Sequence, residues 1–180
     1  MGGCPDLDGD GVRDCLESLI RNGDFATGIA GWMPELGTTA SFSSSDGEGD
    51  PQSGSLLVTN TNHSDVTSGL TMAGAASCLP GARASSYGVW LQVALDPVPD
   101  GQAQAGITFT YYPTTDCSGA PNGISPTNLV DQSVSGWSVA QESVLPPSGT
   151  QSFLARLVVV KPFSQAMASA RFDNLLIRAN

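Results

Sequence analysis

Apolar and polar residues alternate with a period of two along much of the chain after residue 22, which is typical of β-strands with one buried face. Clusters of glycine, proline, aspartate and serine separate the alternating segments, as turns do. The predicted strands are Ala40–Ser43, Ser55–Thr61, Ser86–Leu95, Ala105–Tyr112, Trp137–Val144, Gln151–Val160 and Ala170–Arg178. Short strands at this spacing predict an all-β domain over residues 22–180, built as a two-sheet β-sandwich.

The same alternation assigns strand residues to faces, because successive side chains point to opposite sides of a sheet. The residues predicted to face the core are Tyr87, Val89, Leu91, Val93, Leu95, Ile107, Phe109, Tyr111, Phe153, Ala155, Leu157 and Val159. The residues predicted to face outward include Trp90, Gln92, Thr108, Thr110, Tyr112 and Arg156.

The outward set combines flat rings with hydrogen-bonding side chains. Sugar rings stack their C–H faces on aromatic rings, and their hydroxyls need donors and acceptors. We therefore predict a glycan-binding sheet face that carries Trp90, Gln92, Tyr112 and Arg156. The alternative for each is ordinary packing: Trp90 under a loop or against an N-terminal helix, Tyr112 at a sheet edge, and Arg156 in an ion pair with Glu142.

One stretch has a helical period instead. Leu16, Leu19 and Ile20 recur at i, i+3 and i+4, and Asn22-Gly23 follows them as a helix stop. This pattern predicts a helix over Val12–Arg21. Residues 1–21 are thus predicted to form a separate N-terminal unit, a calcium-binding loop plus a helix, in front of the sandwich.

The calcium loop is predicted from Asp6 to Glu17, which fits the pattern D-x-D-x-D-G-x5-E without a mismatch. Calcium binds several oxygen ligands, and alternate carboxylates can converge on one ion around the sharp turn at Gly11. The predicted ligands are Asp6, Asp8, Asp10, the Val12 carbonyl, Asp14 through water, and Glu17. The alternative is a solvated acidic turn.

The four cysteines are an even number, and no C-x-x-C or paired histidine supports the alternative of a zinc site. Cys4 and Cys15 flank the calcium loop, so we predict that they form one disulfide, and by elimination that Cys78 and Cys117 form the second. Disulfides and a calcium site both favour a secreted or cell-surface protein.

Charge excludes two classes of partner. The 180 residues contain 17 acidic and 7 basic side chains, a net charge of −10, so nucleic acids and anionic membrane surfaces are poor partners. No apolar run reaches the ~18 residues that a membrane span needs. No signal peptide is visible, and Met1-Gly2-Gly3 is interpreted as a start placed before a mature sequence.

Several short motifs resemble, in their order and spacing, the jelly-roll carbohydrate-binding modules of secreted glycoside hydrolases, families 4, 9 and 22 in particular. The resemblance runs from Leu19 to Ile177. It rests on Leu19-Ile20-Arg21-Asn22-Gly23-Asp24-Phe25, Gly31-Trp32, Ser53-Gly54-Ser55-Leu56-Leu57-Val58-Thr59-Asn60, Leu79-Pro80-Gly81, Tyr87, Trp90 and Ala170-Arg171-Phe172-Asp173-Asn174-Leu175. Cys78 with Asp116-Cys117-Ser118-Gly119 resembles a bacterial extracellular subgroup that has a bridge between these positions. The N-terminal unit, residues 1–21, resembles thrombospondin type 3 repeats and one half of a dockerin.

The family resemblance implies a jelly-roll sandwich and a non-catalytic function, with a polysaccharide or other glycan as partner. It also implies a structural calcium between the first and last strands, held by Asp24 and Asp173, although Asp173 could instead cap a turn. Two other functions remain open. One is a structural, adhesive or self-assembling surface module that binds copies of itself or other domains of a larger secreted protein, with calcium stiffening the joint. The other is a glycosidase, for which Glu35 and Glu142 are the conceivable carboxylate pair.

Overall fold

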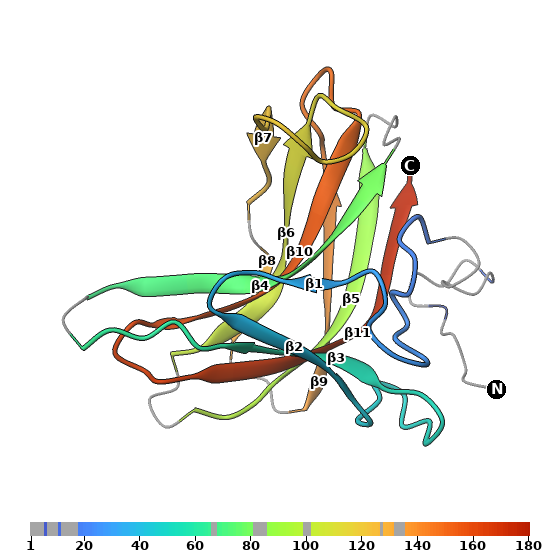
Figure 1. Ribbon diagram of the computed structural model, residues 1–180. Helices are drawn as coiled ribbons and strands as arrows, with labels where there is room; N and C mark the ends of the chain where they lie inside the picture. The colour runs from blue at the N-terminus through green and yellow to red at the C-terminus, as the bar shows by residue number, and fades with distance from the viewer. Residues whose placement is uncertain are drawn as a thin grey trace.

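In the computed structural model, the described residues are 6, 11, 18–65, 68–80, 86–98, 102–126, 128–131 and 136–180. Within them, strands form two antiparallel sheets that pack face to face (Figure 1). The six-stranded sheet has the order β1 (Met33–Pro34), β4 (Leu70–Pro80), β10 (Ser152–Pro162), β6 (Gln104–Tyr112), β7 (Gly123–Ile124), and β8 (Asn128–Asp131) also pairs with β6. The five-stranded sheet has the order β2 (Thr38–Ser43), β3 (Ser55–Asn60), β11 (Ala168–Ala179), β5 (Tyr87–Leu95), β9 (Trp137–Val144).

From β3 to β6, and again from β8 to β11, the chain crosses to the other sheet with each new strand. These crossings make a jelly-roll sandwich, which confirms the predicted all-β fold. All seven predicted strands are present, with ends that differ by at most two residues from the prediction. The alternation was readable because one face of each strand packs against the opposite sheet.

The strand that alternation missed is β4, which has the sequence LTMAGAASCLP. Its alanines and glycine have low β-propensity and give little contrast between faces. The strand forms because β10 pairs with it from end to end, Ser152 opposite Pro80 and Pro162 opposite Leu70. The short strands β1, β7 and β8 were also missed.

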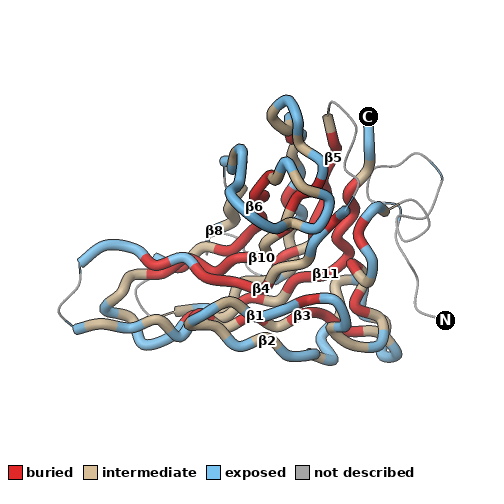
Figure 2. Tube along the Cα trace, turned by 45° about the horizontal axis from the view of Figure 1, so that its top comes forward, coloured by how far each residue is buried: buried red, intermediate tan, exposed pale blue. Residues whose placement is uncertain are grey.

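The core lies between the sheets and includes the side chains that alternation pointed inward. Val89, Leu91 and Val93 of β5 are buried, and Leu95 is partly exposed at the strand end. The Phe153 ring lies at the centre of an aromatic cluster, with centroid distances of 5.1 Å to Tyr87 and 5.5 Å to Phe109. Figure 2 shows the buried residues along β4, β10, β6, β5 and β11, with exposed residues mostly in the connections.

The predicted helix is wrong at its described end. Residues 19 and 20 form bends, and a turn begins at residue 21. The Leu19 N–H donates to the Ile177 carbonyl at 2.8 Å, and the Leu175 N–H donates to the Gly23 carbonyl at 2.9 Å. Beyond Phe172, β11 no longer pairs with β3, so its backbone edge is open there. The segment satisfies that edge, and this tertiary pairing overrides the helical pattern. Residues 12–17 lie outside the described residues.

One predicted disulfide is present. Cys78 in β4 is bonded to Cys117 in the loop after β6, with a Cα–Cα distance of 6.0 Å. The predicted Cys4–Cys15 bridge lies outside the described residues. In the described ranges, no helix is long and apolar enough to cross a membrane.

Candidate functional site

The four residues predicted to bind a glycan do not share one face. Tyr112 and Arg156 lie on the outer face of the six-stranded sheet, whereas Trp90 and Gln92 lie on the outer face of the five-stranded sheet. A sandwich has two outer faces, and alternation within a strand does not tell which sheet the strand joins. The four side chains therefore divide into two separate pairs.

Trp90 is off the main core, as predicted, but it is not an open platform. It lies opposite Gln141 and Leu176, and only 9% of the residue is exposed. The Arg178 guanidinium lies 5.6 Å from its ring centroid, and a Cβ at Gly88 would come within 2.5 Å of the ring. These contacts favour the packing alternative for Trp90.

Gln92 is also engaged, because its Oε1 accepts a hydrogen bond from the Asn174 side-chain amide at 2.8 Å. The outer face of the five-stranded sheet therefore presents a covered ring and an internally bonded amide where the sugar-binding pair was predicted.

The outer face of the six-stranded sheet carries a bidentate ion pair. Arg156 Nε lies 2.5 Å from Glu35 Oε1, and Arg156 Nη2 lies 2.8 Å from Glu35 Oε2. Glu35 Oε2 also accepts the Gly74 N–H at 3.1 Å, so the carboxylate is held on three sides. The hydrogen bonds to Glu35 raise the pKa of Arg156. The alternative partner, Glu142, is not used.

Arg156 reaches Glu35 across β4, where Ala76 lies opposite Arg156 and is too small to block the guanidinium. On the other side of Arg156, the buried Thr108 hydroxyl donates to the Ser125 carbonyl at 3.2 Å. Met33, which is 71% exposed, lies beside Ala76 on the same face, and Tyr112 lies partly exposed at the end of β6.

This face combines charged hydrogen-bonding groups with exposed apolar side chains. Arg156 and Glu35 together offer donors and acceptors in fixed positions, because each orients the other. Met33 and Tyr112 offer surfaces for the C–H groups of a sugar ring. Glu35 was considered only as a glycosidase carboxylate, and its pairing with Arg156 was not predicted, since the two residues lie 121 positions apart in the sequence.

The two carboxylates considered for glycosidase chemistry do not face one another. Glu35 is on the outer face of the six-stranded sheet, whereas Glu142 lies opposite the inward-pointing Val89 and faces the space between the sheets. A glycosidase needs its two carboxyl groups on either side of one scissile bond. Glu35 and Glu142 therefore cannot act as that pair.

Of the N-terminal calcium loop, the structure describes only Asp6 and Gly11. Gly11 has a φ of +90°, as a sharp glycine turn requires, and its N–H donates to Asp6 Oδ2 at 2.9 Å. The other predicted ligands lie outside the described residues: Asp8, Asp10, Val12, Asp14 and Glu17. Calcium binding by this loop stays a prediction.

The predicted second calcium site centres on Asp173, which is fully buried in β11. Its two oxygens accept the Gly47 and Asn174 N–H groups, each at 2.8 Å. Burial, with smaller contributions from the Asp46 and Asp24 charges, raises the pKa of Asp173 to about 7. A cation would neutralise this cluster of charges.

The charges around Asp173 would suit a calcium ion, but the ligand geometry is incomplete. Among the described residues, no three acidic, histidine or cysteine side chains are grouped closely enough to hold a metal ion. Asp24 and Asp173 thus fit a calcium ion by charge but do not form a ligand set by themselves. The charge of Asp46 also acts on Asp173, because it contributes to the raised pKa of that carboxyl.

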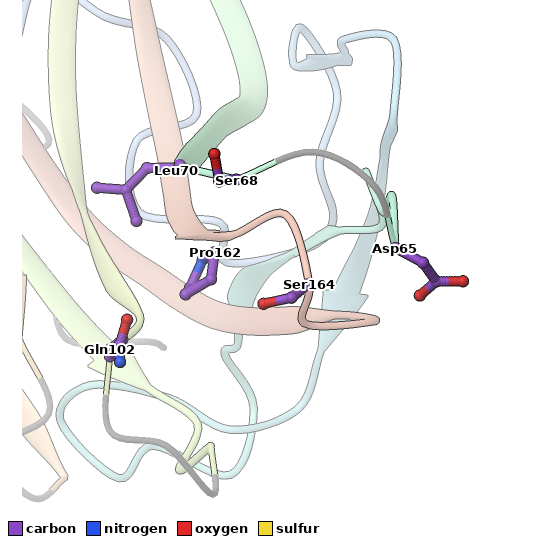
Figure 3. A pocket seen from close by; sticks show the side chains of 7 residues that line it. Asp65, Ser68, Leu70, Gln102, Pro162 and Ser164 are labelled. Carbon is purple, nitrogen blue, oxygen red and sulfur yellow. The ribbon is translucent and has the colours of Figure 1, made fainter.

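A surface pocket of about 490 Å³ lies where β4 begins and β10 ends, lined in part by Leu70, Gln102, Pro162 and Ser164. In Figure 3, Asp65 points away from the other labelled side chains. Asp65 instead pairs with His63, at 3.1 Å between His63 Nε2 and Asp65 Oδ1. The pocket therefore has no converging charged groups among the residues that the structure describes.

No protein-family model matches the sequence, and no curated protein is similar enough in sequence to match it. Solved structures do match the fold. The C-terminal family 22 carbohydrate-binding module of Clostridium thermocellum Xyn10B is 16% identical with a TM-score of 0.59, over 97% of this chain and 97% of that chain. The CBM22-1 xylan-binding domain of Paenibacillus barcinonensis Xyn10C is 16% identical with a TM-score of 0.57, over 87% of this chain and 90% of that chain.

A third match is the enzymatically active domain of bacteriophage CBA120 tailspike protein 4, which is 10% identical with a TM-score of 0.58. It covers 89% of this chain but only 21% of that chain. At these identities the similarity shows the fold alone, a jelly-roll sandwich of the kind found in carbohydrate-binding modules.

Proposed function

We propose that this chain is a non-catalytic carbohydrate-binding module that binds a polysaccharide on the outer face of its six-stranded sheet. The observation that carries the proposal is the bidentate Arg156–Glu35 pair on that face, which also carries Met33 and Tyr112. The similarity of the fold to xylan-binding modules supports the substrate class. Trp90 and Gln92 are not part of this site.

Arg156 would donate to sugar hydroxyls and Glu35 would accept from them, while the apolar side chains contact the ring. Because the pair is already ordered, binding costs little side-chain entropy. A face that offers a few hydrogen bonds and no large exposed ring gives modest affinity. We expect dissociation constants in the range of about 10 μM to 1 mM.

The test is isothermal titration with xylan and xylohexaose, repeated with the double variant Glu35→Gln/Arg156→Gln, which avoids leaving one charge unpaired. Arg171→Gln is the matched control, since Arg171 is a partly buried arginine that pairs with Asp96 on the other sheet. We expect at least a tenfold loss for the double variant and no loss for the control. Equal binding by the double variant, or no polysaccharide bound by the wild type, would falsify the proposal.

A structural or self-assembling module is the second candidate, and one observation favours it. Met33, Leu36 and Met72 are exposed near the β1 side of the same sheet. Exposed apolar side chains of this kind also occur at interfaces between copies of a protein. Light scattering decides the matter: a dimer that dissociates in the Met33→Ser/Met72→Ser variant supports assembly, and a monomer at high concentration rejects it.

We further propose that the protein works outside cells and that calcium stabilises it. The Cys78–Cys117 disulfide supports an oxidising compartment, where free calcium is also abundant. The loop at Asp6–Glu17 and the Asp24–Asp173 region are the proposed calcium sites.

A further inference from the structure

A pocket of about 620 Å³ lies between the end of β4 and the N-terminal residues 19–21. Arg21 and Ser77 are the polar side chains in its lining, and the apolar walls come from Leu19, Ile20, Leu79 and Pro80. Arg21 is exposed and Ser77 is partly exposed, so a bound molecule can reach both side chains. Among the described residues, no acidic side chain lines this pocket.

Arg21 differs from the other cationic side chains that the structure describes, because it has no partner there. The other four are engaged in ion pairs, in a ring contact or by carbonyl groups: Arg156 with Glu35, Arg171 with Asp96, Arg178 with Trp90, and Lys161 with backbone oxygens. The chain has 17 acidic and 7 basic side chains, so an arginine without a carboxylate partner is unusual in it. Its guanidinium is therefore available to a carboxylate from outside the chain.

Polar groups near Arg21 are also unused. The Ser77 hydroxyl makes no hydrogen bond with any described residue. β1 pairs with β4 at Ala75 and Ala76, so the same edge of β4 has no strand partner beyond Ala76. Gly31, two residues before β1, lines the pocket, which places the pocket at this edge. Because alternate residues of an antiparallel strand direct both their N–H and C=O groups to one edge, the pocket also borders backbone donors and acceptors.

The lining of the pocket narrows the ligand chemistry. Water alone can solvate an exposed arginine, but here the guanidinium, a free hydroxyl and apolar walls border one concave site. The guanidinium fits a carboxylate through two parallel hydrogen bonds. The Ser77 hydroxyl and the strand edge fit the hydroxyls of a sugar, and the apolar walls fit its C–H groups. The volume of about 620 Å³ lies within the usual range for small-molecule sites.

We propose that this pocket binds an acidic sugar residue, a uronic acid, whose carboxylate is held by Arg21. The net charge of −10 repels an anion at long range, but salt screens this repulsion beyond about 8 Å at physiological ionic strength. The contact with Arg21 is direct and is screened much less. The pocket contains neither Arg156 nor Glu35, so the proposal does not rest on the proposed function of the sheet face.

The experiment is NMR titration of the whole protein with methyl glucuronide, with methyl glucoside as the neutral sugar and acetate as the carboxylate without a sugar. Arg21→Gln is the key variant, and a thermal melt checks that its fold is retained. Arg171→Gln is the matched control, because it removes the same charge on the other sheet. We expect the wild type to bind the glucuronide saturably and at least about fivefold more tightly than either comparison ligand, with a similar loss in Arg21→Gln and none in Arg171→Gln.

Arg21→Lys gives a second readout. It keeps the charge but loses the planar fork, so its affinity for the glucuronide should lie between those of the wild type and Arg21→Gln. Acetate that binds as tightly as the glucuronide would reject a sugar site, and a glucuronide that does not bind, or that binds Arg21→Gln equally well, would reject the pocket altogether. Xylohexaose reports on the sheet face, and its binding should be the same in Arg21→Gln and the wild type. If Arg21→Gln loses xylohexaose as well, the pocket belongs to the sheet-face site and the separate assignment is wrong.

Discussion

Trp90 shows how much the neighbours of a single residue decide its role. Its ring is covered by Arg178 and lies against Gly88, although strand alternation points it away from the core. We expect Trp90→Ala to destabilise the protein by about 3–5 kcal/mol, as expected for deleting a large buried ring. Urea unfolding measures the loss, and Trp137→Ala, at a partly exposed position, should lose less.

The same variant separates stability from binding. Under conditions where it stays folded, Trp90→Ala should bind polysaccharide as well as the wild type does. A variant with normal unfolding and lost glycan binding would contradict this and restore Trp90 as a sugar contact.

The raised pKa of Glu142 leads to a prediction about how stability depends on pH. Its pKa is about 7 in the folded protein, against about 4 for an unfolded glutamate. Between those values the folded state binds more protons than the unfolded state, so stability falls as the pH rises from about 4 to 7. Asp173, with a folded pKa of about 7, acts in the same direction.

Thermal melts from pH 4.5 to 8 measure this dependence. We expect the melting temperature of the wild type to fall from pH 4.5 to about 7 and then to level off, and that of Glu142→Gln to fall less, because the amide removes one of the two titrations. Parallel curves for the two proteins would show that Glu142 is ionised and satisfied in the folded state.

Residue roles were predictable where they depend on one strand and not where they depend on two. The inward set on β5 followed from alternation, and Val89, Leu91 and Val93 are buried. The Arg156–Glu35 pair depends on how β1, β4 and β10 lie side by side, which no local pattern contains. Glu142 illustrates the same limit, because its position in a strand does not tell that its carboxyl is buried and that its charge raises the pKa of Tyr111.

At the scale of elements, the Cys78–Cys117 bridge ties β4 to the loop after β6 across a sequence separation of 39. A bridge over such a separation limits the unfolded chain, so we expect the Cys78→Ala/Cys117→Ala variant to lose about 3 kcal/mol of stability. Urea unfolding checks the value. A variant as stable as the wild type would mean that neighbouring contacts hold the loop, such as the Cys117 N–H donated to the Ser152 hydroxyl at 2.9 Å.

Element prediction failed where a partner strand outweighs local preference. β4 has little strand propensity of its own and is held along its length by β10. Residues 18–23 lie along the open edge of β11, although Leu19 and Ile20 belong to a helical pattern. In both places long-range backbone pairing decides the structure, and propensity is the weaker effect.

At the scale of the whole molecule, the net charge of −10 includes two acidic regions: the predicted loop over residues 6–17 and the surroundings of Asp173. Carboxylates gathered in this way repel one another and destabilise the folded state unless protons or cations neutralise them. The family resemblance predicted the jelly-roll topology and Asp173, but the docking of the 46–50 loop on Asp173 appears only in the fold.

Calcium should therefore stabilise the protein. A ligand that binds only the folded state adds about 2.7 kcal/mol when its concentration is 100 times the dissociation constant. We expect calcium to raise the melting temperature relative to a chelator, and magnesium to do so less. The increase should be larger at pH 8 than at pH 5. Below pH 7 the Asp173 carboxylate takes up a proton, and this proton competes with calcium for the carboxylate.

Two variants divide the effect between the sites. In isothermal titration, Asp8→Asn should bind one calcium ion fewer than the wild type because its N-terminal loop is altered. Asp173→Asn should also bind one calcium ion fewer, at the different site in the sandwich. The melting temperature of the sandwich should respond to calcium in Asp8→Asn and much less in Asp173→Asn. If calcium gives no heat and no shift in the wild type, the acidic residues are stabilised by protons and backbone N–H groups alone, and both calcium assignments are wrong. If only Asp8→Asn loses binding, Asp173 is a structural carboxyl that anchors the 46–50 loop through the Gly47 N–H.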